Sequence, residues 1–273
     1  MPRKLEYNAT LVQRTEISPG LLVIRVVPDR PLFDFTPGQY TVLGLKRKEP
    51  RCDGADEESD ELLERDPEEV ILRAYSIASS SLEREHLDIY LALVGSGELT
   101  PRLFALDIGA RLYLGPKATG MFTLEQVPRN KHIALVSTGT GLGPYISMLR
   151  TYLPHHAHRT FLILHGARYS WDLGYRDELV MLSRLCPHLK YIPVVSRPNQ
   201  DAAWRGHTGY VQNYLEDDFV RKMTYLPLSP QVFEVFLCGN PAMIEQAAAH
   251  LQRYGFEKDS RKQKGTIHVE EYW

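Results

Sequence analysis

At 273 residues, with 43% hydrophobic and 24% charged residues, the chain is long enough for two ordinary domains and too apolar to be wholly disordered. Its three widely spaced cysteines (Cys52, Cys186 and Cys238) argue against a disulfide framework, a zinc site and an iron–sulfur cluster, and its net charge of −2 hides an uneven distribution. No apolar run reaches the roughly 18 residues of a membrane-spanning helix, and the N-terminus lacks the apolar core of a signal peptide, so we expect a soluble cytoplasmic protein.

The first half of the chain reads as β-strands. Five runs are rich in β-branched or aromatic residues and are separated by turn residues such as Pro37-Gly38. They cover residues 21–27, 40–45, 70–77, 87–94 and 111–114. Because no long helical period lies between most of them, this half is predicted to be an antiparallel barrel or sandwich.

An acidic segment, residues 49–69, interrupts these strands. It holds eleven Asp or Glu residues against two Arg, a local charge of −9, which leaves +7 for the rest of the chain. We predict a solvated loop with a short helical turn around residues 60–65. The positive remainder favours anionic partners, either phosphate-bearing cofactors or an acidic protein, although scattered surface charge explains it equally well.

The pattern changes to an alternation of strands and helices near Pro128, where we place a domain boundary between residues 1–127 and 128–273. Short apolar strands are predicted at residues 132–137, 161–165, 191–196 and 232–237, and helices at residues 144–153, 176–185 and 243–253. This alternation indicates a parallel α/β sheet.

The segment VSTGTGLGP, which ends at Pro144, follows one of these strands and opens a helix, the context of a nucleotide-phosphate loop. Gly139, Gly141 and Gly143 let the backbone approach a pyrophosphate, and the helix N-terminus presents free N–H groups. The spacing departs from the dinucleotide fingerprint G-x-G-x-x-G, and a purely structural glycine turn explains it equally well.

Two arginines occupy matching positions in this half. Arg168 follows the strand that ends at His165, and Arg197 follows the strand that ends at Ser196. Open α/β sheets bind ligands beyond the carboxyl ends of their strands, and guanidinium groups suit bidentate phosphate binding. Their matching positions make them candidate phosphate ligands rather than ordinary surface residues.

Other segments each have a structural and a functional interpretation. Cys238 is either a small buried hydrophobe or a pocket residue that touches a flat ring. The segment 73–76 (RAYS) is either a plain strand or a set that stacks on a ring and binds phosphate. The segment 97–101 (GELTP) reads as a turn that caps a helix at Thr100, whose free N–H groups suit phosphate. The terminal Tyr272-Trp273 either fills a groove or stacks on a ring.

Three histidines, His155, His156 and His158, lie in a polar connection with no carboxylate or cysteine nearby. We interpret them as part of a solvated loop and not as a metal site. Nothing in the sequence resembles a Ser–His–Asp arrangement or a basic aromatic groove for nucleic acid.

In their order along the chain, these segments resemble the bacterial type of the ferredoxin/flavodoxin–NADP(+) reductase family. The series is PGQY (37–40), RAYS (73–76), LTPRL (99–103), GTGLGP (139–144), GARYSWDLGY (166–175), VVSRP (194–198), CGNP (238–241) and the final EYW. It spans nearly the whole chain, so it is highly specific. The resemblance implies an N-terminal antiparallel Greek-key β-barrel that binds FAD and a C-terminal α/β Rossmann-like parallel sheet that binds NADP(H), with a C-terminal tail returning to the FAD.

The resemblance also implies roles for individual residues. Tyr75 would pack against the isoalloxazine, Ser76 would sit near its reactive nitrogen, and Cys238 would approach the nicotinamide, which makes these three the implied catalytic residues. The implied FAD contacts are Arg73, Ala74, Tyr75, Ser76, Tyr90, Leu91, Ala92, Leu93, Glu98, Leu99, Thr100, Thr140, Tyr272 and Trp273. The implied NADP contacts are Gly139, Gly141, Gly143, Ala167, Arg168, Ser196, Arg197, Arg205, Cys238 and Gly239. No metal ligand is implied.

The chain departs from the family pattern in two places. The acidic insert is longer than the usual short connection, and Tyr210 stands where relatives often carry an arginine. Arg205 is the expected substitute, and NADP stays favoured over NAD.

The implied activity is hydride transfer from NADPH to N5 of FAD, followed by release of single electrons to an acidic carrier, ferredoxin or flavodoxin. We expect a monomer with no nucleic-acid or membrane partner, whose positive charge outside the insert steers the carrier. Two alternatives stay open: an NAD(P)H-dependent reductase of free flavin or small acceptors, and a non-catalytic flavin-binding redox sensor. The glycine loop, Arg168, Arg197 and the CGNP segment argue against the sensor.

Overall fold

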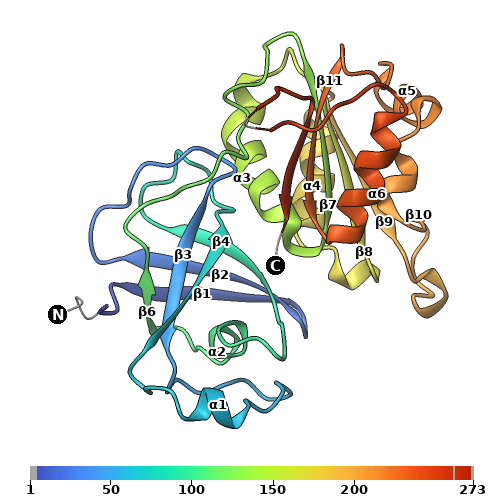
Figure 1. Cartoon of the computed structure of the whole chain (residues 1–273). Coiled ribbons are helices and arrows are strands. Elements are labelled where there is room, and N and C mark those ends of the chain that lie inside the picture. Colours follow the sequence, from blue (N-terminus) through green and yellow to red (C-terminus); the bar gives the residue numbers. More distant parts are fainter. Residues whose placement is uncertain (1–4, 261, 272–273) are drawn as a thin grey trace. The chain divides into compact units, whose positions relative to one another are not determined.

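The computed structural model describes residues 5–260 and 262–271 and divides into two compact units (Figure 1). The first consists of Met1–Thr123 with Ile146–Thr151, and the second of Leu124–Tyr145 with Tyr152–Trp273. Within the described residues, no helix has the length and apolar character needed to cross a membrane.

The first unit is a six-stranded antiparallel barrel. Its strands are β1 (Ala9–Ser18), β2 (Leu21–Pro28), β3 (Tyr40–Lys46), β4 (Val70–Ser76), β5 (Leu87–Ala92) and β6 (Arg111–Leu114). They pair in the order β4-β3-β6-β1-β2-β5, and an antiparallel bridge between Ile77 and Ile89 joins the two edges of the sheet. Alternate side chains of β2, those of Leu22, Ile24 and Val26, are fully buried in the barrel core. The predicted antiparallel barrel is therefore confirmed.

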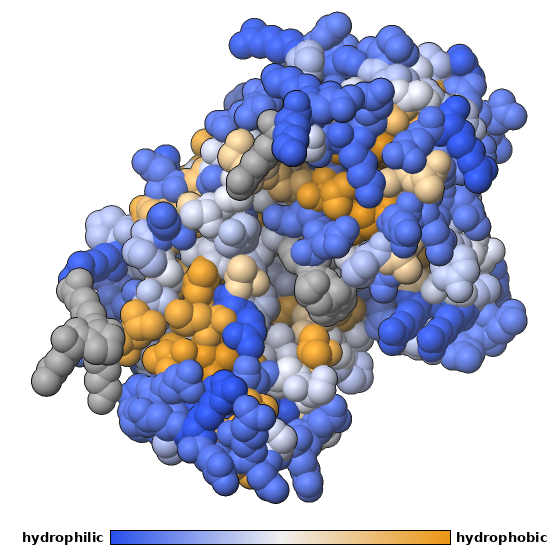
Figure 2. Space-filling model, viewed as in Figure 1, coloured by the Kyte–Doolittle hydropathy of each residue, from blue (hydrophilic) through white to orange (hydrophobic). Residues whose placement is uncertain are grey.

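The acidic insert connects β3 to β4 and contains the predicted helical turn, α1 (Asp60–Leu63). Figure 2 shows a hydrophilic surface over α1, as expected for a solvated segment. The side chain of Glu58, however, is only 9% exposed and pairs with Arg102 of helix α2 (Thr100–Phe104) at 2.7 Å. The insert is thus anchored to the barrel and not simply solvated.

The second unit is built on a six-stranded parallel sheet with the order β10-β9-β8-β7-β11-β12. Its strands are β7 (His132–Thr138), β8 (Phe161–Ala167), β9 (Leu189–Val195), β10 (His207–Thr208), β11 (Phe233–Gly239) and β12 (Ile267–Glu271). Its α-helices are α4 (Arg176–Leu185), α5 (Asp217–Thr224) and α6 (Pro241–Gln252), and α3 (Gly143–Tyr152), which follows β7 in the chain, is shared between the two units. The predicted parallel α/β sheet is confirmed.

Short 3-10 helices lie in the connections of this unit. They are η1 (Gly139–Leu142), η2 (Leu153–His155), η3 (Ser170–Asp172), η4 (Pro198–Gln200) and η5 (Val211–Tyr214). The core is a continuous apolar layer in which the sheet residues Val136, Leu164 and Leu237 pack with Ile244 and Ala247 of α6, all fully buried. This packing fixes the carboxyl edge of the sheet, where most of the candidate residues of this unit lie.

Candidate functional site

The carboxyl ends of β7 and β11 form the topological switch point of the parallel sheet. From β7 the chain proceeds outward to β8 and β9, and it then returns to add β11 on the other side of β7. In open α/β sheets, ligands bind in the crevice at such a point. The glycine loop leaves β7 here, and the segment that starts at Cys238 leaves β11 beside it.

The two turns at the switch point are packed backbone to backbone. Thr138 Oγ1 accepts a hydrogen bond from the amide of Asn240 at 2.9 Å. A Cβ atom built on Gly141 would lie 2.4 Å from the carbonyl oxygen of Cys238. A Cβ on Gly139, whose φ is +55°, would meet nothing within 4 Å, so the outer side of the loop is open. This glycine loop, whose backbone is uncovered on its outer side and which leads into the ten-residue helix α3, has room for a pyrophosphate.

Substituting Gly141 by alanine is expected to lower the free energy of unfolding by about 1–3 kcal/mol, because the new methyl group would overlap backbone that has little freedom to move. Urea unfolding measures the loss. Gly20→Ala is the matched control, since a Cβ there meets nothing within 4 Å. Equal stability of the two variants would show that the turn at Cys238 yields easily.

Arg168 and Arg197 lie next to each other beyond β8 and β9. The amide of Arg197 donates to the carbonyl of Arg168 at 3.0 Å, and the amide of Ser196 donates to Ala167 at 2.9 Å. Both arginine side chains are exposed. The guanidinium of Arg197 donates to the hydroxyl of Tyr169 at 3.3 Å. The structure therefore brings the two predicted phosphate ligands together on one edge of the sheet.

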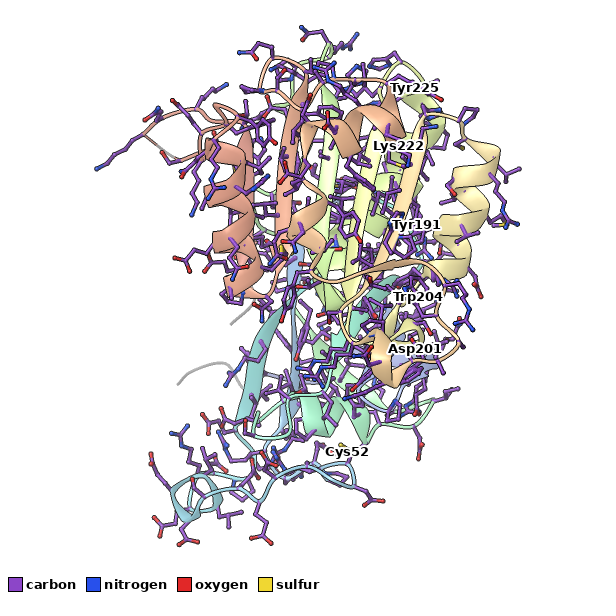
Figure 3. The ribbon with its side chains drawn as sticks, turned by 90° about the vertical axis from the view of Figure 1, so that its right-hand side faces the viewer. Cys52, Tyr191, Asp201, Trp204, Lys222 and Tyr225 are labelled. Atoms are coloured by element: carbon purple, nitrogen blue, oxygen red, sulfur yellow. The ribbon has the colours of Figure 1, made fainter. Side chains whose placement is uncertain are left out.

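The loop after Arg197 is held by two buried side chains, which Figure 3 labels. Asp201 is 3% exposed and accepts a hydrogen bond from the amide of Ser170 at 2.6 Å. Trp204 is 9% exposed and donates its indole N–H to the carbonyl of His207 at 2.8 Å. Arg205 follows directly and donates to the carbonyls of Ala202 and Trp204, which ties the proposed substitute arginine to its own loop.

Tyr169 was not among the predicted site residues. Its ring stacks on Trp171 with the centroids 4.7 Å apart, and its hydroxyl links Arg197 to Gln200. Its place directly after Arg168, within GARYSWDLGY, is the signal that points to it. Tyr210, the departure from the family pattern, is 66% exposed.

Of the two interpretations of Cys238, the structure supports the small buried hydrophobe. Its relative exposure is 0%, and its neighbour Gly239 is also buried. The implied approach of the thiol to a nicotinamide stays a prediction.

The histidines of this unit do not form a metal site within the part of the chain that the structure describes. His156 stacks on Tyr152, whereas His155 and His158 are exposed. Burial lowers the pKa of His165 to about 3, and its Nδ1 lies 3.1 Å from the hydroxyl of Tyr191. His165 is therefore neutral at physiological pH and structural.

The barrel presents the segment RAYS on β4. Arg73 and Ala74 are exposed, Tyr75 is half-buried, and Ser76 is 7% exposed. Burial raises the pKa of the Tyr75 phenol, so the ring stays neutral. A neutral, half-buried aromatic ring beside a partly exposed guanidinium fits a flat ring with an anionic tail.

Arg73 is held by an ionic network. Its guanidinium donates to Glu98 Oε2 at 2.6 Å, and Glu98 Oε1 accepts from Arg47 at 2.7 Å. The hydrogen bond from Arg47 is the main reason why the pKa of Glu98 lies below its usual value. Two of the five N–H donors of Arg73 are thus engaged within the barrel, to Leu72 O and Glu98, and the described contacts leave donors for an anionic ligand.

The remaining barrel candidates lie on and after β5. Tyr90 and Leu91 are buried, and Ala92 and Leu93 are half-buried. The predicted cap at Thr100 is wrong by one residue, since the N-cap of α2 is Leu99. The Thr100 hydroxyl instead holds the preceding glycine turn, accepting from the amide of Val94 at 3.1 Å. Thr140 is half-buried in the glycine loop of the second unit, and Tyr272 and Trp273 lie outside the described residues.

Comparison with known proteins agrees with this geometry. Residues 135–249 match the family model of the oxidoreductase NAD-binding domain. The flavodoxin/ferredoxin–NADP reductase of Escherichia coli (strain K12) is 33% identical over 215 residues, which cover 78% of this chain and 77% of that protein. The corresponding protein of Buchnera aphidicola subsp. Baizongia pistaciae is 29% identical over 250 residues, covering 91% and 92%. A ferredoxin NADP+ reductase from Neisseria gonorrhoeae, crystallised with FAD and NADP, shares the fold, with a TM-score of 0.79, 98% of each chain covered and 22% identity.

A closed antiparallel barrel, together with a parallel sheet whose residues match the oxidoreductase NAD-binding domain and whose switch point carries a glycine loop, defines a two-domain pyridine-nucleotide oxidoreductase. Within that class, the chain belongs to the flavodoxin/ferredoxin–NADP reductase family.

Proposed function

We propose that this protein uses FAD to pass electrons between NADPH and a one-electron carrier, ferredoxin or flavodoxin. The observation that carries the proposal is the pair of exposed arginines, Arg168 and Arg197, beside an open glycine loop in a chain of this family. Arginines at this edge suit the additional phosphate of NADP, which NAD lacks.

The barrel residues would hold FAD. Tyr75 would pack on the flat ring, Ser76 would hydrogen-bond it, and Arg73 would bind the phosphates while Glu98 fixes its guanidinium. When bound, FAD supplies the chemistry that couples a two-electron hydride donor to a one-electron acceptor. The contribution of the chain is to orient the ring and to provide donors for the phosphates.

The α/β residues would hold NADPH. The open backbone at Gly139 and the N-terminus of α3 suit the pyrophosphate, and Arg168 and Arg197 suit the remaining phosphate. Tyr169 limits the positions that the Arg197 guanidinium can take.

Anaerobic absorbance spectroscopy tests the proposal. The purified protein, reconstituted with FAD, is titrated separately with NADPH and NADH. Bleaching of the flavin at far lower NADPH than NADH supports it. Bleaching by both at similar concentrations gives weight to Tyr210 and removes the NADP preference. A protein that cannot be reconstituted with FAD overturns the proposal.

Electron transfer to an acidic carrier is expected to slow as salt is added, because the residues outside the insert carry a net charge of +7 that favours encounter with an anion. We expect kcat/KM for the carrier to fall about tenfold when the Debye length shrinks from roughly 30 Å to 8 Å. Stopped-flow or steady-state reduction of the carrier measures this. A neutral quinone acceptor is the control, and equal salt dependence of the two acceptors contradicts steering.

A further inference from the structure

The first part of the acidic insert, residues 51–58, is bonded to the turn that precedes α2. We call these residues the insert arm. Arg51 donates from Nη1 to the carbonyl of Gly97 at 2.9 Å and from Nη2 to the carbonyl of Gly95 at 2.8 Å. One guanidinium of the arm therefore holds two carbonyls of the glycine turn.

Main-chain bonds reinforce this contact. The amide of Cys52, labelled in Figure 3, donates to the carbonyl of Pro101 at 3.0 Å, and the amide of Asp56 donates to Gly95 at 3.2 Å. The arm is thus bonded to both ends of the segment 95–101. The bonds join residues more than 35 positions apart in the chain, so they order the turn through tertiary contact.

Glu58 completes the buried part of the arrangement. All five N–H donors of Arg102 are engaged: two bonds reach the Glu58 carboxylate, two reach the carbonyl of Arg47, and one reaches the carbonyl of Glu98. The Arg102 side chain is 2% exposed and that of Glu58 is 9% exposed. Glu58 is therefore the counter-charge that allows Arg102 to be buried beneath the turn.

The turn carries the side chain that fixes Arg73. Glu98 lies in it, between Arg47 and Arg73, and its main-chain carbonyl is one of the groups held by Arg102. Any displacement of the turn moves the Glu98 carboxylate and releases the Arg73 guanidinium. The insert arm is in this way connected, over three successive contacts, to the residue proposed to bind the FAD phosphates.

We infer that the insert arm pre-organises the turn at residues 95–101 for the binding of FAD. Arg51 and Glu58 are positioning residues that raise the affinity for FAD through this turn. The inference rests on the proposed binding of FAD to the barrel. An ordered turn loses less conformational entropy when a ligand binds, so the arm lowers the dissociation constant without touching the cofactor.

Two variants test the inference: Glu58→Gln, and Arg51→Met in case the first fails to fold. The matched control is Glu57→Gln, which removes the same charge from the neighbouring exposed position. Hydrogen exchange in the apoprotein reports on the turn through the amides of Gly97 and Leu103, which bond to Val94 and Leu99. The dissociation constant and the dissociation rate of FAD are measured by flavin fluorescence.

In both variants we expect faster hydrogen exchange in the segment 95–103 and unchanged exchange in the β1–β2 ladder. We also expect FAD binding to be weakened roughly tenfold, which is the equivalent of one charge-assisted hydrogen bond. Glu57→Gln should match the wild type. Unchanged exchange in the turn overturns the bracing role, and faster exchange with unchanged FAD affinity overturns the role toward the cofactor. A wild-type protein that binds no FAD refutes the proposed function instead, while the exchange data still report on the arm.

Discussion

Replacing Arg102 by methionine is expected to lower the free energy of unfolding by about 3–5 kcal/mol. The variant leaves the Glu58 carboxylate, only 9% exposed, without its bidentate partner, and it removes the donors that serve the carbonyls of Arg47 and Glu98. Buried acceptors without donors cost far more than the bond itself contributes. Urea unfolding followed by circular dichroism measures the loss.

Arg111→Met is the matched control for this prediction. Arg111 also pairs with a carboxylate, that of Asp29, but the two side chains are 40% and 47% exposed, so its loss should cost less than about 1 kcal/mol. A double variant that also replaces Glu58 by methionine should recover part of the stability, because the Glu58 carboxylate is then no longer buried without Arg102. Equal losses for Arg102→Met and Arg111→Met would mean that water reaches the Arg102 pair.

The strands and helices could be predicted from the sequence wherever their buried residues recur with a regular period. In the second half of the chain, four apolar strands and three helices follow directly from their hydrophobic patterns, and α4 has the predicted bounds. Strand β1 was missed because register shifts between Leu11 and Gln13, and between Glu16 and Ser18, break its alternation and leave a polar stretch exposed. Helix α5 was missed because it is only eight residues long.

The candidate site was predictable where residues follow strand ends. Arg168 and Arg197 meet because parallel strands finish at one edge, and that placement needs only the strand assignments. The ionic network beneath the barrel turn was not predictable. Glu58 and Arg102 are 44 positions apart, and composition cannot tell which of eleven acidic residues in the insert is buried.

The prediction of an N-cap at Thr100 was wrong for a similar reason. A threonine before a helical pattern is an ordinary N-cap, but a competing acceptor and donor were available in the backbone of Val94. The hydroxyl closes the glycine turn in place of the helix end. Local preference was overridden by a contact six residues away, which strengthens the case that this turn is held in one conformation from several sides.

Substitution of Arg168 or Arg197 by alanine is expected to raise KM for NADPH by roughly 10–100-fold, the cost of one lost charge-assisted contact with a phosphate. The nucleotide comparison separates two roles. An arginine that binds the phosphate unique to NADPH should leave KM for NADH unchanged when it is removed. An arginine that binds the shared pyrophosphate should weaken both nucleotides equally. We expect the first behaviour from Arg197, whose guanidinium is fixed by Tyr169.

Arg184→Ala is the control for both variants, because Arg184 is an exposed residue in the last turn of α4. Tyr169→Phe provides a milder test, since it keeps the ring under the Arg197 guanidinium and removes only the two bonds of the hydroxyl, to Arg197 at 3.3 Å and to Gln200 at 2.6 Å. We expect it to raise KM for NADPH about threefold, with kcat unchanged. If neither arginine variant changes the ratio of NADPH to NADH affinity, the selectivity must come from elsewhere on this edge, and Arg205, held by the carbonyls of Ala202 and Trp204, becomes the residue to replace next.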